Sequence, residues 1–96
     1  MGFAEIESKL KAEQTRLKGL KVRALAVFGS VARNEATPGS DVDFLVEFEG
    51  PTTFDRYMDL KLFLEDLLHC QVDLVTRKGI RPELRPSIEQ ELRYVA

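Results

Sequence analysis

The sequence holds very few of the residues that build disulfide frameworks or zinc sites. Cys70 is the only cysteine and His69 is the only histidine. A single cysteine excludes an internal disulfide, and one cysteine with one histidine cannot supply four zinc ligands within one chain. The two residues are adjacent at the predicted end of a helix. Packing, or a charge interaction of His69 with the helix C-terminus, therefore explains them more simply than catalysis does.

Long hydrophobic runs are also absent. No apolar stretch approaches the ~20 residues that a membrane-spanning helix needs. Residues 1–11 contain no signal-peptide core and carry two glutamates. We therefore expect a cytoplasmic protein without membrane contact. A composition of 44% hydrophobic and 31% charged residues is typical of a folded chain rather than a disordered one, and the length of 96 residues favours a single domain, 1–96.

Positive charge does not gather in a sustained stripe. Residues 1–34 carry seven basic and three acidic groups, residues 35–73 carry two basic and ten acidic groups, and residues 74–96 carry five basic and three acidic groups. Proteins that bind nucleic-acid duplexes usually present a continuous basic surface, so direct nucleic-acid binding is not expected. Solvated faces explain most of these charges. They explain less well the aspartates that interrupt apolar runs, namely Asp41, Asp43 and Asp73.

Apolar periodicity predicts alternating helices and strands in the first three quarters of the chain. Residues 3–18 and 54–68 show helical patterns, and residues 22–28 and 71–75 are typical of strands. Residues 41–48 predict a strand with apolar residues on one face and the acidic positions on the other. This order predicts a small α/β (α+β) domain, in which helices pack mainly on one face of a mixed sheet.

The C-terminal tail gives weaker signals. Pro82 is predicted at the first position of a helix. Residues 87–90 resemble a capping box, and residues 94–95 are predicted to pack against the core or to form an edge strand. No linker or repeat separates the tail from the rest of the chain.

Two chemical features meet in the middle of the chain. Gly29-Ser30 follows the first predicted strand, and Ser30 is predicted to cap a short helix whose N–H groups would face an anion. After ten intervening residues, Asp41 and Asp43 open the second strand on one face. If the second and third strands are neighbours, Asp73 joins them. The ordinary alternative is that these aspartates cap turns or sit at strand ends facing water.

Converging carboxylates need compensation. Two like charges ~4 Å apart repel by about 4 kcal/mol at an effective dielectric constant of about 20, which opposes folding unless a cation binds or the groups stay solvated. Magnesium prefers hard oxygen ligands from a few carboxylates and from substrate phosphates. The acids and the Gly-Ser turn together therefore predict a site for a magnesium-bound polyphosphate.

Four further residues are candidates with open alternatives. Arg33 either clamps a phosphate or lies on the surface. Ser40, beside Asp41, is counted with the nucleotide-binding candidates. Arg77 and Lys78 either contact the polyphosphate or a partner, or form a solvated basic turn.

The motifs together resemble a known signature. Gly29-Ser30, ten intervening residues, Asp41-Val-Asp43 and the later Val72-Asp73-Leu74 are similar to the nucleotidyltransferase signature of the polymerase β superfamily. Phe-Gly-Ser-Val-Ala-Arg with Ser-Asp-Val-Asp-Phe-Leu-Val more closely resembles the minimal nucleotidyltransferases (MNT), commonly encoded beside a HEPN-domain partner as prokaryotic toxin–antitoxin pairs. Asn34 stands where this motif often has glycine. Asparagine tolerates left-handed backbone angles, so we expect the turn to survive.

The resemblance implies a set of roles. Gly29 and Ser30 would hold the triphosphate of ATP, and Asp41 and Asp43 would ligate two Mg²⁺ ions. Asp73 would complete the metal site or help to deprotonate the attacking hydroxyl. The implied function is transfer of AMP to a hydroxyl, a tyrosine, of a HEPN toxin in a hetero-oligomer, as the antitoxin of a type VII-like pair.

Two alternatives remain open at this point. One is a non-catalytic antitoxin that neutralises its partner by occlusion. The other is a small-molecule nucleotidyltransferase that needs a partner subunit to supply the substrate-binding surface.

Overall fold

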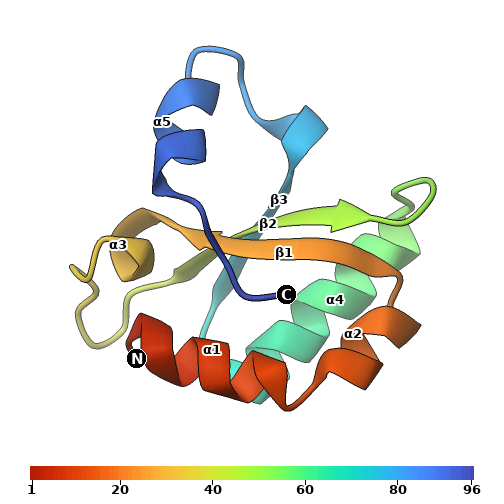
Figure 1. Cartoon of the computed structure of the whole chain (residues 1–96), viewed down its shortest axis with the longest axis horizontal. Helices are drawn as coiled ribbons and strands as arrows, with labels where there is room; N and C mark the ends of the chain where they lie inside the picture. Colours follow the sequence, from red (N-terminus) through yellow and green to blue (C-terminus); the bar gives the residue numbers. More distant parts are fainter.

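The computed structural model describes residues 1–96 as short helices and strands around one four-stranded sheet (Figure 1). The strand order is β3-β2-β1-β4, with β2 and β3 parallel and the other neighbours antiparallel. The sheet is therefore mixed, as predicted. In chain order the elements are α1 (Phe3–Lys11), α2 (Gln14–Gly19), β1 (Val22–Phe28), α3 (Gly29–Ala32), β2 (Val42–Phe48), α4 (Phe54–Leu68), β3 (Val72–Thr76), the 3-10 turn η1 (Arg77–Gly79), α5 (Arg85–Glu91) and β4 (Arg93–Tyr94).

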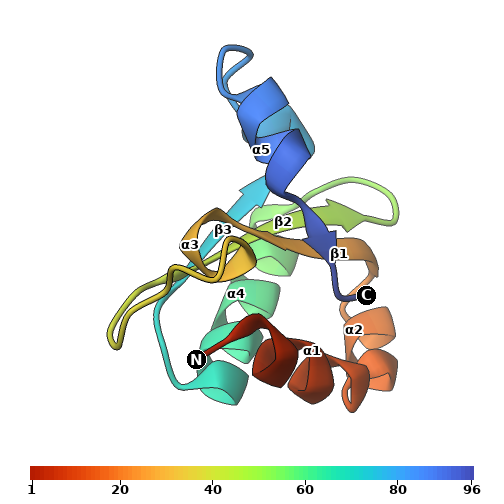
Figure 2. The same ribbon diagram turned by 60° about the vertical axis from the view of Figure 1, so that its left-hand side comes forward.

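Most helices cover one face of the sheet. Figures 1 and 2 show α1, α2 and α4 beneath the strands, α3 at one end, and α5 alone on the opposite side. This confirms the predicted arrangement. The helix-covered face holds a cluster of eighteen buried residues, which includes the whole predicted apolar stripe of the first helical region. Its members in that region are Phe3, Ile6, Leu10 and Leu17.

Strand β2 divides its side chains between the two faces as the alternation predicts. The apolar positions Val42, Phe44, Val46 and Phe48 belong to the helix-side cluster. The intervening positions, which include Asp43, therefore face the side that carries α5. We call this side the open face. It is nevertheless partly covered, since Ala26, Leu45 and Ile80 are buried outside the eighteen-residue cluster.

Helix α4 supplies the crossover between the parallel strands β2 and β3. It begins after Thr53, whose hydroxyl accepts a hydrogen bond from the Arg56 N–H at 3.1 Å, and it ends at His69 in a left-handed conformation (φ 54°). Its bounds match the predicted helix. It is the longest helix, at 15 residues, and no helix combines the length and apolar character needed to cross a membrane.

Residues from α4 also protect the edge of the sheet. Lys61 Nζ donates to the Val72 carbonyl at 2.7 Å, and the Val72 N–H donates to Glu65 Oε2 at 3.1 Å. These bonds satisfy backbone groups of β3, which is an edge strand and would otherwise offer them to another chain.

The prediction of one helix over residues 3–18 is wrong in detail. The chain bends at Ala12 and Glu13, where the Glu13 backbone leaves the helical region (φ −115°, ψ 24°). Helix α2 then runs toward β1, so that the chain can enter the sheet at Val22. The predicted apolar stripe is nevertheless buried as one group, because Leu17 of α2 packs into the same core as the stripe residues of α1.

Two predictions for the tail are also wrong. The last helix begins at Arg85 rather than at Pro82, and Pro86 lies in its first turn, where the missing N–H costs nothing. Pro82 instead belongs to the preceding turn, where its carbonyl accepts from the Arg85 N–H at 3.3 Å. Ser87 lies inside the helix, so it forms no capping box. Of the two alternatives for residues 94–95, Tyr94 forms the edge strand β4 with Arg93 and pairs with β1, whereas Val95 packs in the core.

Candidate active site

Two aspartates face each other across the parallel strand pair. Asp43 on β2 is in register with Asp73 on β3, and both project on the open face. Asp43 is partly buried, whereas Asp73 and the preceding Asp41 are exposed. The condition set by the sequence, that the second and third strands be neighbours, is therefore met.

The electrostatics of Asp43 show how close these acids are. Its pKa is raised from 3.8 to about 6, first because burial penalises the charged form. The charge and hydrogen bonding of Asp73 raise the pKa further, and the charge of Asp41 adds to it. Only Arg33 acts in the opposite direction. The open face therefore carries an excess of negative charge at this point.

Glycine is required at position 29 for a steric reason. Gly29 follows Phe28, which pairs with Asp43 across the β1–β2 ladder. The φ of Gly29 is +74°. A Cβ there would overlap Oδ2 of Asp43. The turn after β1 therefore lies against the carboxylate of β2. The prediction that Ser30 caps the helix is wrong, because Phe28 holds the cap position and Ser30 lies in the first turn of α3.

A residue that sequence reasoning missed completes this corner. The Gly29 N–H donates to Glu91 Oε2 at 3.2 Å, and Arg33 Nη1 donates to Glu91 Oε1 at 2.7 Å. Arg33 Nε also lies 3.4 Å from Glu35 Oε1. The hydrogen bond and charge of Glu91 raise the pKa of Arg33. No local signal marked Glu91, since it is the last residue of a short helix 62 positions from Gly29.

The segment between α3 and β2 shapes the approach to Asp41. Asn34 adopts φ 59°, so the turn survives without glycine as expected. Ser40 Oγ accepts from the Thr37 N–H at 3.0 Å and lies 2.9 Å from Thr37 Oγ1, which fixes the tip of the loop. A cavity of about 480 Å³ opens between this loop and the end of α4. Its lining includes Ser40, Asp41, His69 and Cys70.

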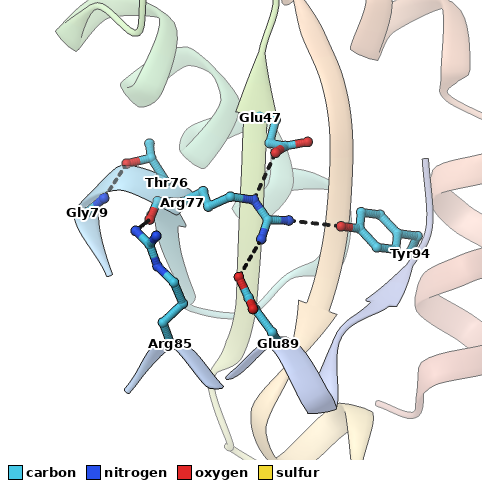
Figure 3. A network of polar contacts seen from close by, with 7 residues as sticks. All are labelled: Glu47, Thr76, Arg77, Gly79, Arg85, Glu89 and Tyr94. Atoms are coloured by element: carbon cyan, nitrogen blue, oxygen red, sulfur yellow. Dashed lines mark hydrogen bonds and ion pairs between the residues drawn. The ribbon is translucent and has the colours of Figure 1, made fainter. Parts of the chain in front are cut away.

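Arg77 has a role that neither sequence interpretation described. Figure 3 shows its guanidinium between three elements: Nε donates to Glu47 on β2 at 2.9 Å, Nη1 to Glu89 on α5 at 2.9 Å, and Nη2 to the Tyr94 hydroxyl at 3.0 Å. Arg77 is therefore neither a solvated residue nor a free phosphate ligand. It joins the end of β3 to the C-terminal segment, while Lys78 is exposed.

The donor set at the aspartates suits magnesium with a bound substrate. No group of three or more carboxylate, imidazole or thiol side chains is arranged to hold a metal ion by itself. What the structure brings together is the pair Asp43 and Asp73, with Asp41 near enough to act on Asp43. Magnesium usually takes one or two carboxylates and obtains its remaining ligands from water and substrate phosphates. This acid pair fits that requirement.

Fold and motif together define a nucleotidyltransferase, because the Gly-Ser turn ends one strand beside acids on the next two. The nucleotidyltransferase domain family matches residues 6–95. The chain belongs to this family and, within it, to the minimal nucleotidyltransferases.

Similar proteins support this assignment over the whole chain. The protein adenylyltransferase MntA of Thermococcus cleftensis is 39% identical, with 95% of this chain and 93% of the relative covered. MJ0128 of Methanocaldococcus jannaschii, a candidate protein adenylyltransferase, is 43% identical, with 97% of each covered. A solved candidate minimal nucleotidyltransferase superposes with a TM-score of 0.82 at 36% identity, covering 97% of this chain and 95% of the other.

More distant structures share the fold. A toxin–antitoxin crystal structure with AMP-PNP superposes with a TM-score of 0.74 at 21% identity, covering 94% of this chain and 72% of the other. A complex of a tri-AMPylated Shewanella oneidensis HEPN toxin with its MNT antitoxin gives a TM-score of 0.59 at 17% identity, covering 90% and 71%.

Proposed function

We propose that this protein transfers AMP from ATP, with Mg²⁺, to a hydroxyl of a HEPN-domain toxin, and that it acts as the antitoxin of a type VII-like pair. The observation that carries the proposal is the register of Asp43 and Asp73 on neighbouring strands beside the Gly29 turn. The names of the relatives support adenylyl transfer to protein. A solved complex that shares this chain's fold contains a tri-AMPylated HEPN toxin, which supports a HEPN toxin as the partner.

The roles of the residues follow from their positions. Asp41 and Asp43, with Asp73 beside them, would hold two Mg²⁺ ions, which supply positive charge to neutralise the polyphosphate. The Gly29-Ser30 turn and Arg33 would bind the triphosphate. Ser40 borders the cavity, whose volume of about 480 Å³ lies within the ~300–1,000 Å³ that ligand sites usually span. The lining of the cavity includes Asp41, but none of the groups proposed to bind the triphosphate.

The transfer step is a substitution at the α-phosphorus. The bond from the acceptor oxygen to the α-phosphorus forms, the bond to the bridging oxygen breaks, and pyrophosphate leaves with that electron pair. The acceptor is a tyrosine hydroxyl, and its proton passes to Asp73. Asp73 suits this role because its exposed side chain is accessible to an incoming partner, whereas Asp43 beside it is partly buried. Positioning and charge stabilisation account for most catalysis of such a step.

The test is direct transfer of label. The purified protein is incubated with its HEPN partner, Mg²⁺ and ATP labelled at the α-phosphate, and the products are resolved by mass spectrometry. Label on a toxin tyrosine that disappears with Asp43→Asn supports the proposal. Asp59→Asn is the matched control, since it removes an equal charge from an exposed position on α4. No label on the partner, or equal label with Asp43→Asn, rejects it.

A further inference from the structure

The carboxylate of Glu91 occupies an anion position in the turn after β1. Its two oxygens accept separately, one from the Gly29 N–H at 3.2 Å and the other from Arg33 Nη1 at 2.7 Å. A backbone N–H and a guanidinium arranged around one anionic group form the kind of donor set that also binds a phosphate. These are the same two groups that the proposed function gives to the triphosphate.

A donor that is already bonded to Glu91 is not available to a ligand. We propose that Glu91 closes the nucleotide site from within, so that binding of a polyphosphate must displace Glu91 and loosen the C-terminal helix α5 that carries it. This inference rests on the proposed function for its ligand. Beyond that function, it states that Glu91 of this chain competes with the nucleotide for the same donors. The position of α5 would then depend on whether nucleotide is bound.

The attachment of α5 to the sheet is weak enough for such a displacement. None of the seven residues of α5 is buried, and a helix this short has little stability without packing. In addition, Nε of Arg85 is buried without a hydrogen-bond partner in the closed arrangement. An unpaired buried donor destabilises the state that contains it. The docked state of α5 therefore lacks a buried apolar contact of its own and carries one unpaired buried donor.

Polar contacts hold α5 instead of a core. Arg77 Nη1 donates to Glu89, and Arg85 Nη2 donates to the Arg77 carbonyl at 3.0 Å (Figure 3). The Arg33–Glu91 pair is the third attachment, at the other end of the helix. Releasing Glu91 leaves the Arg77 contacts in place. The movement would therefore be a local opening at the end of α5 rather than loss of the whole segment.

Charge gives the competition a direction. Glu91 carries one negative charge, whereas a triphosphate carries several and can bind Mg²⁺ at the aspartates at the same time. The triphosphate therefore outcompetes the carboxylate at sufficient concentration. A single phosphate lacks the reach to the metal and should compete far less well.

The test measures binding of two probes, AMP-PNP and inorganic tripolyphosphate, each with Mg²⁺, by calorimetry. Glu91→Gln removes the charge and keeps the shape, so both probes should bind about fivefold to tenfold more tightly, the range that matches the typical net contribution of one hydrogen bond. Glu83→Gln is the matched control, since it removes an exposed acid of the same segment that makes no contact with Gly29 or Arg33. It should leave both affinities unchanged.

A second measurement does not depend on the variant. Hydrogen exchange of the wild-type protein should show faster exchange over the last turn of α5, which ends at Glu91, when tripolyphosphate binds, while the strands stay protected. The proposal would be overturned if Glu91→Gln bound the probes no more tightly than wild type while Glu83→Gln behaved like wild type. Glu91 would then be a positioning residue for Arg33. Binding without faster exchange in α5 would also overturn it. If neither probe binds any variant, the proposed function itself fails and the competition fails with it.

Discussion

Asp43 and Asp73 occupy paired positions on parallel neighbouring strands, and the charge of Asp73 raises the pKa of Asp43. The effect is visible on Asp43, where burial comes first and Asp73 second among the causes that raise its pKa to about 6. A carboxyl that titrates this late, in contact with a second one, is a candidate both for metal binding and for proton exchange. The pair therefore gives the first prediction.

Asp73→Asn should lower the pKa of Asp43 without returning it to 3.8. The substitution removes a neighbouring charge, but the larger cause, burial, stays. Carbon-13 NMR titration of the Asp43 carboxyl in the metal-free protein measures this midpoint. Asp55→Asn, on the exposed part of α4, serves as the control and should not move it. A midpoint unaffected by Asp73→Asn would show that the two carboxyls do not interact.

Asp43→Asn should abolish transfer and yet stabilise the metal-free fold. Because the folded pKa is above the unfolded value, the folded state binds more protons between about pH 4 and pH 6, and stability falls as pH rises through this window. The rise of the Asp43 pKa from 3.8 to about 6 corresponds to about 3 kcal/mol, which solvent screening of this partly exposed group reduces to about 1–2 kcal/mol.

Chemical denaturation at several pH values measures this difference. The gain of Asp43→Asn over wild type should be near zero below about pH 4 and constant above about pH 7. Mg²⁺ should reduce the gain, because it neutralises the wild-type site and not the variant. A variant less stable than wild type at pH 7.5 would contradict the prediction.

The sequence predicts the site well where its signal is local. The alternation in β2 placed Asp43 on the face opposite Phe44, and the strand has the predicted face assignment. That Asp73 joins the site could be predicted only on the condition that its strand lies beside β2, because nothing in the residues around Asp73 indicates the neighbouring strand. The pairing of β2 with β3 depends on the crossover through α4, which is a property of the whole chain.

The tail was less predictable for a physical reason. Pro82 and Pro86 are both acceptable in the first turn of a helix, and only the turn over residues 81–85 decides between them. Glu91 bonds to Gly29 and Arg33, and Arg77 bonds to Glu47, so each of these partners lies at least 30 residues away in the sequence. Arg77 also bonds to Glu89 within the tail. Ion pairs of this kind have no sequence period, so composition shows the charges but not their partners.

Gly29→Ala should destabilise the protein more than a left-handed glycine replacement elsewhere. The alanine must adopt φ +74° and its Cβ must displace the Asp43 carboxylate. Gly39→Ala is the matched control, since Gly39 has φ +88° but nothing within 4 Å of a built Cβ. We expect a loss of about 1–2 kcal/mol for Gly39→Ala from backbone strain alone, and about 1–3 kcal/mol more for Gly29→Ala from overlap. Equal losses by denaturant unfolding would refute the close approach.

Arg77→Lys should loosen α5 while the sheet stays intact. A lysine ammonium keeps the charge but cannot donate in three fixed directions to Glu47, Glu89 and Tyr94. We expect a loss of about 1 kcal/mol in unfolding free energy and faster hydrogen exchange over residues 85–94. Lys78→Arg, a change at the exposed neighbouring position, should alter neither. Faster exchange throughout the strands would show instead that Arg77 supports the whole fold.

Neutralisation of the toxin in cells separates catalysis from occlusion. A double substitution, Asp41→Asn with Asp43→Asn, removes two charges at the site and leaves the helix-side core untouched. If adenylyl transfer silences the partner, cells that express the HEPN toxin with this variant should stop growing, even though the variant still binds the toxin in a pull-down. The matched control, Asp55→Asn with Asp59→Asn, removes the same charge from exposed positions of α4 and should protect as wild type does. Protection by the active-site variant equal to wild type would mean that the surface, not the acids, carries the antitoxin function.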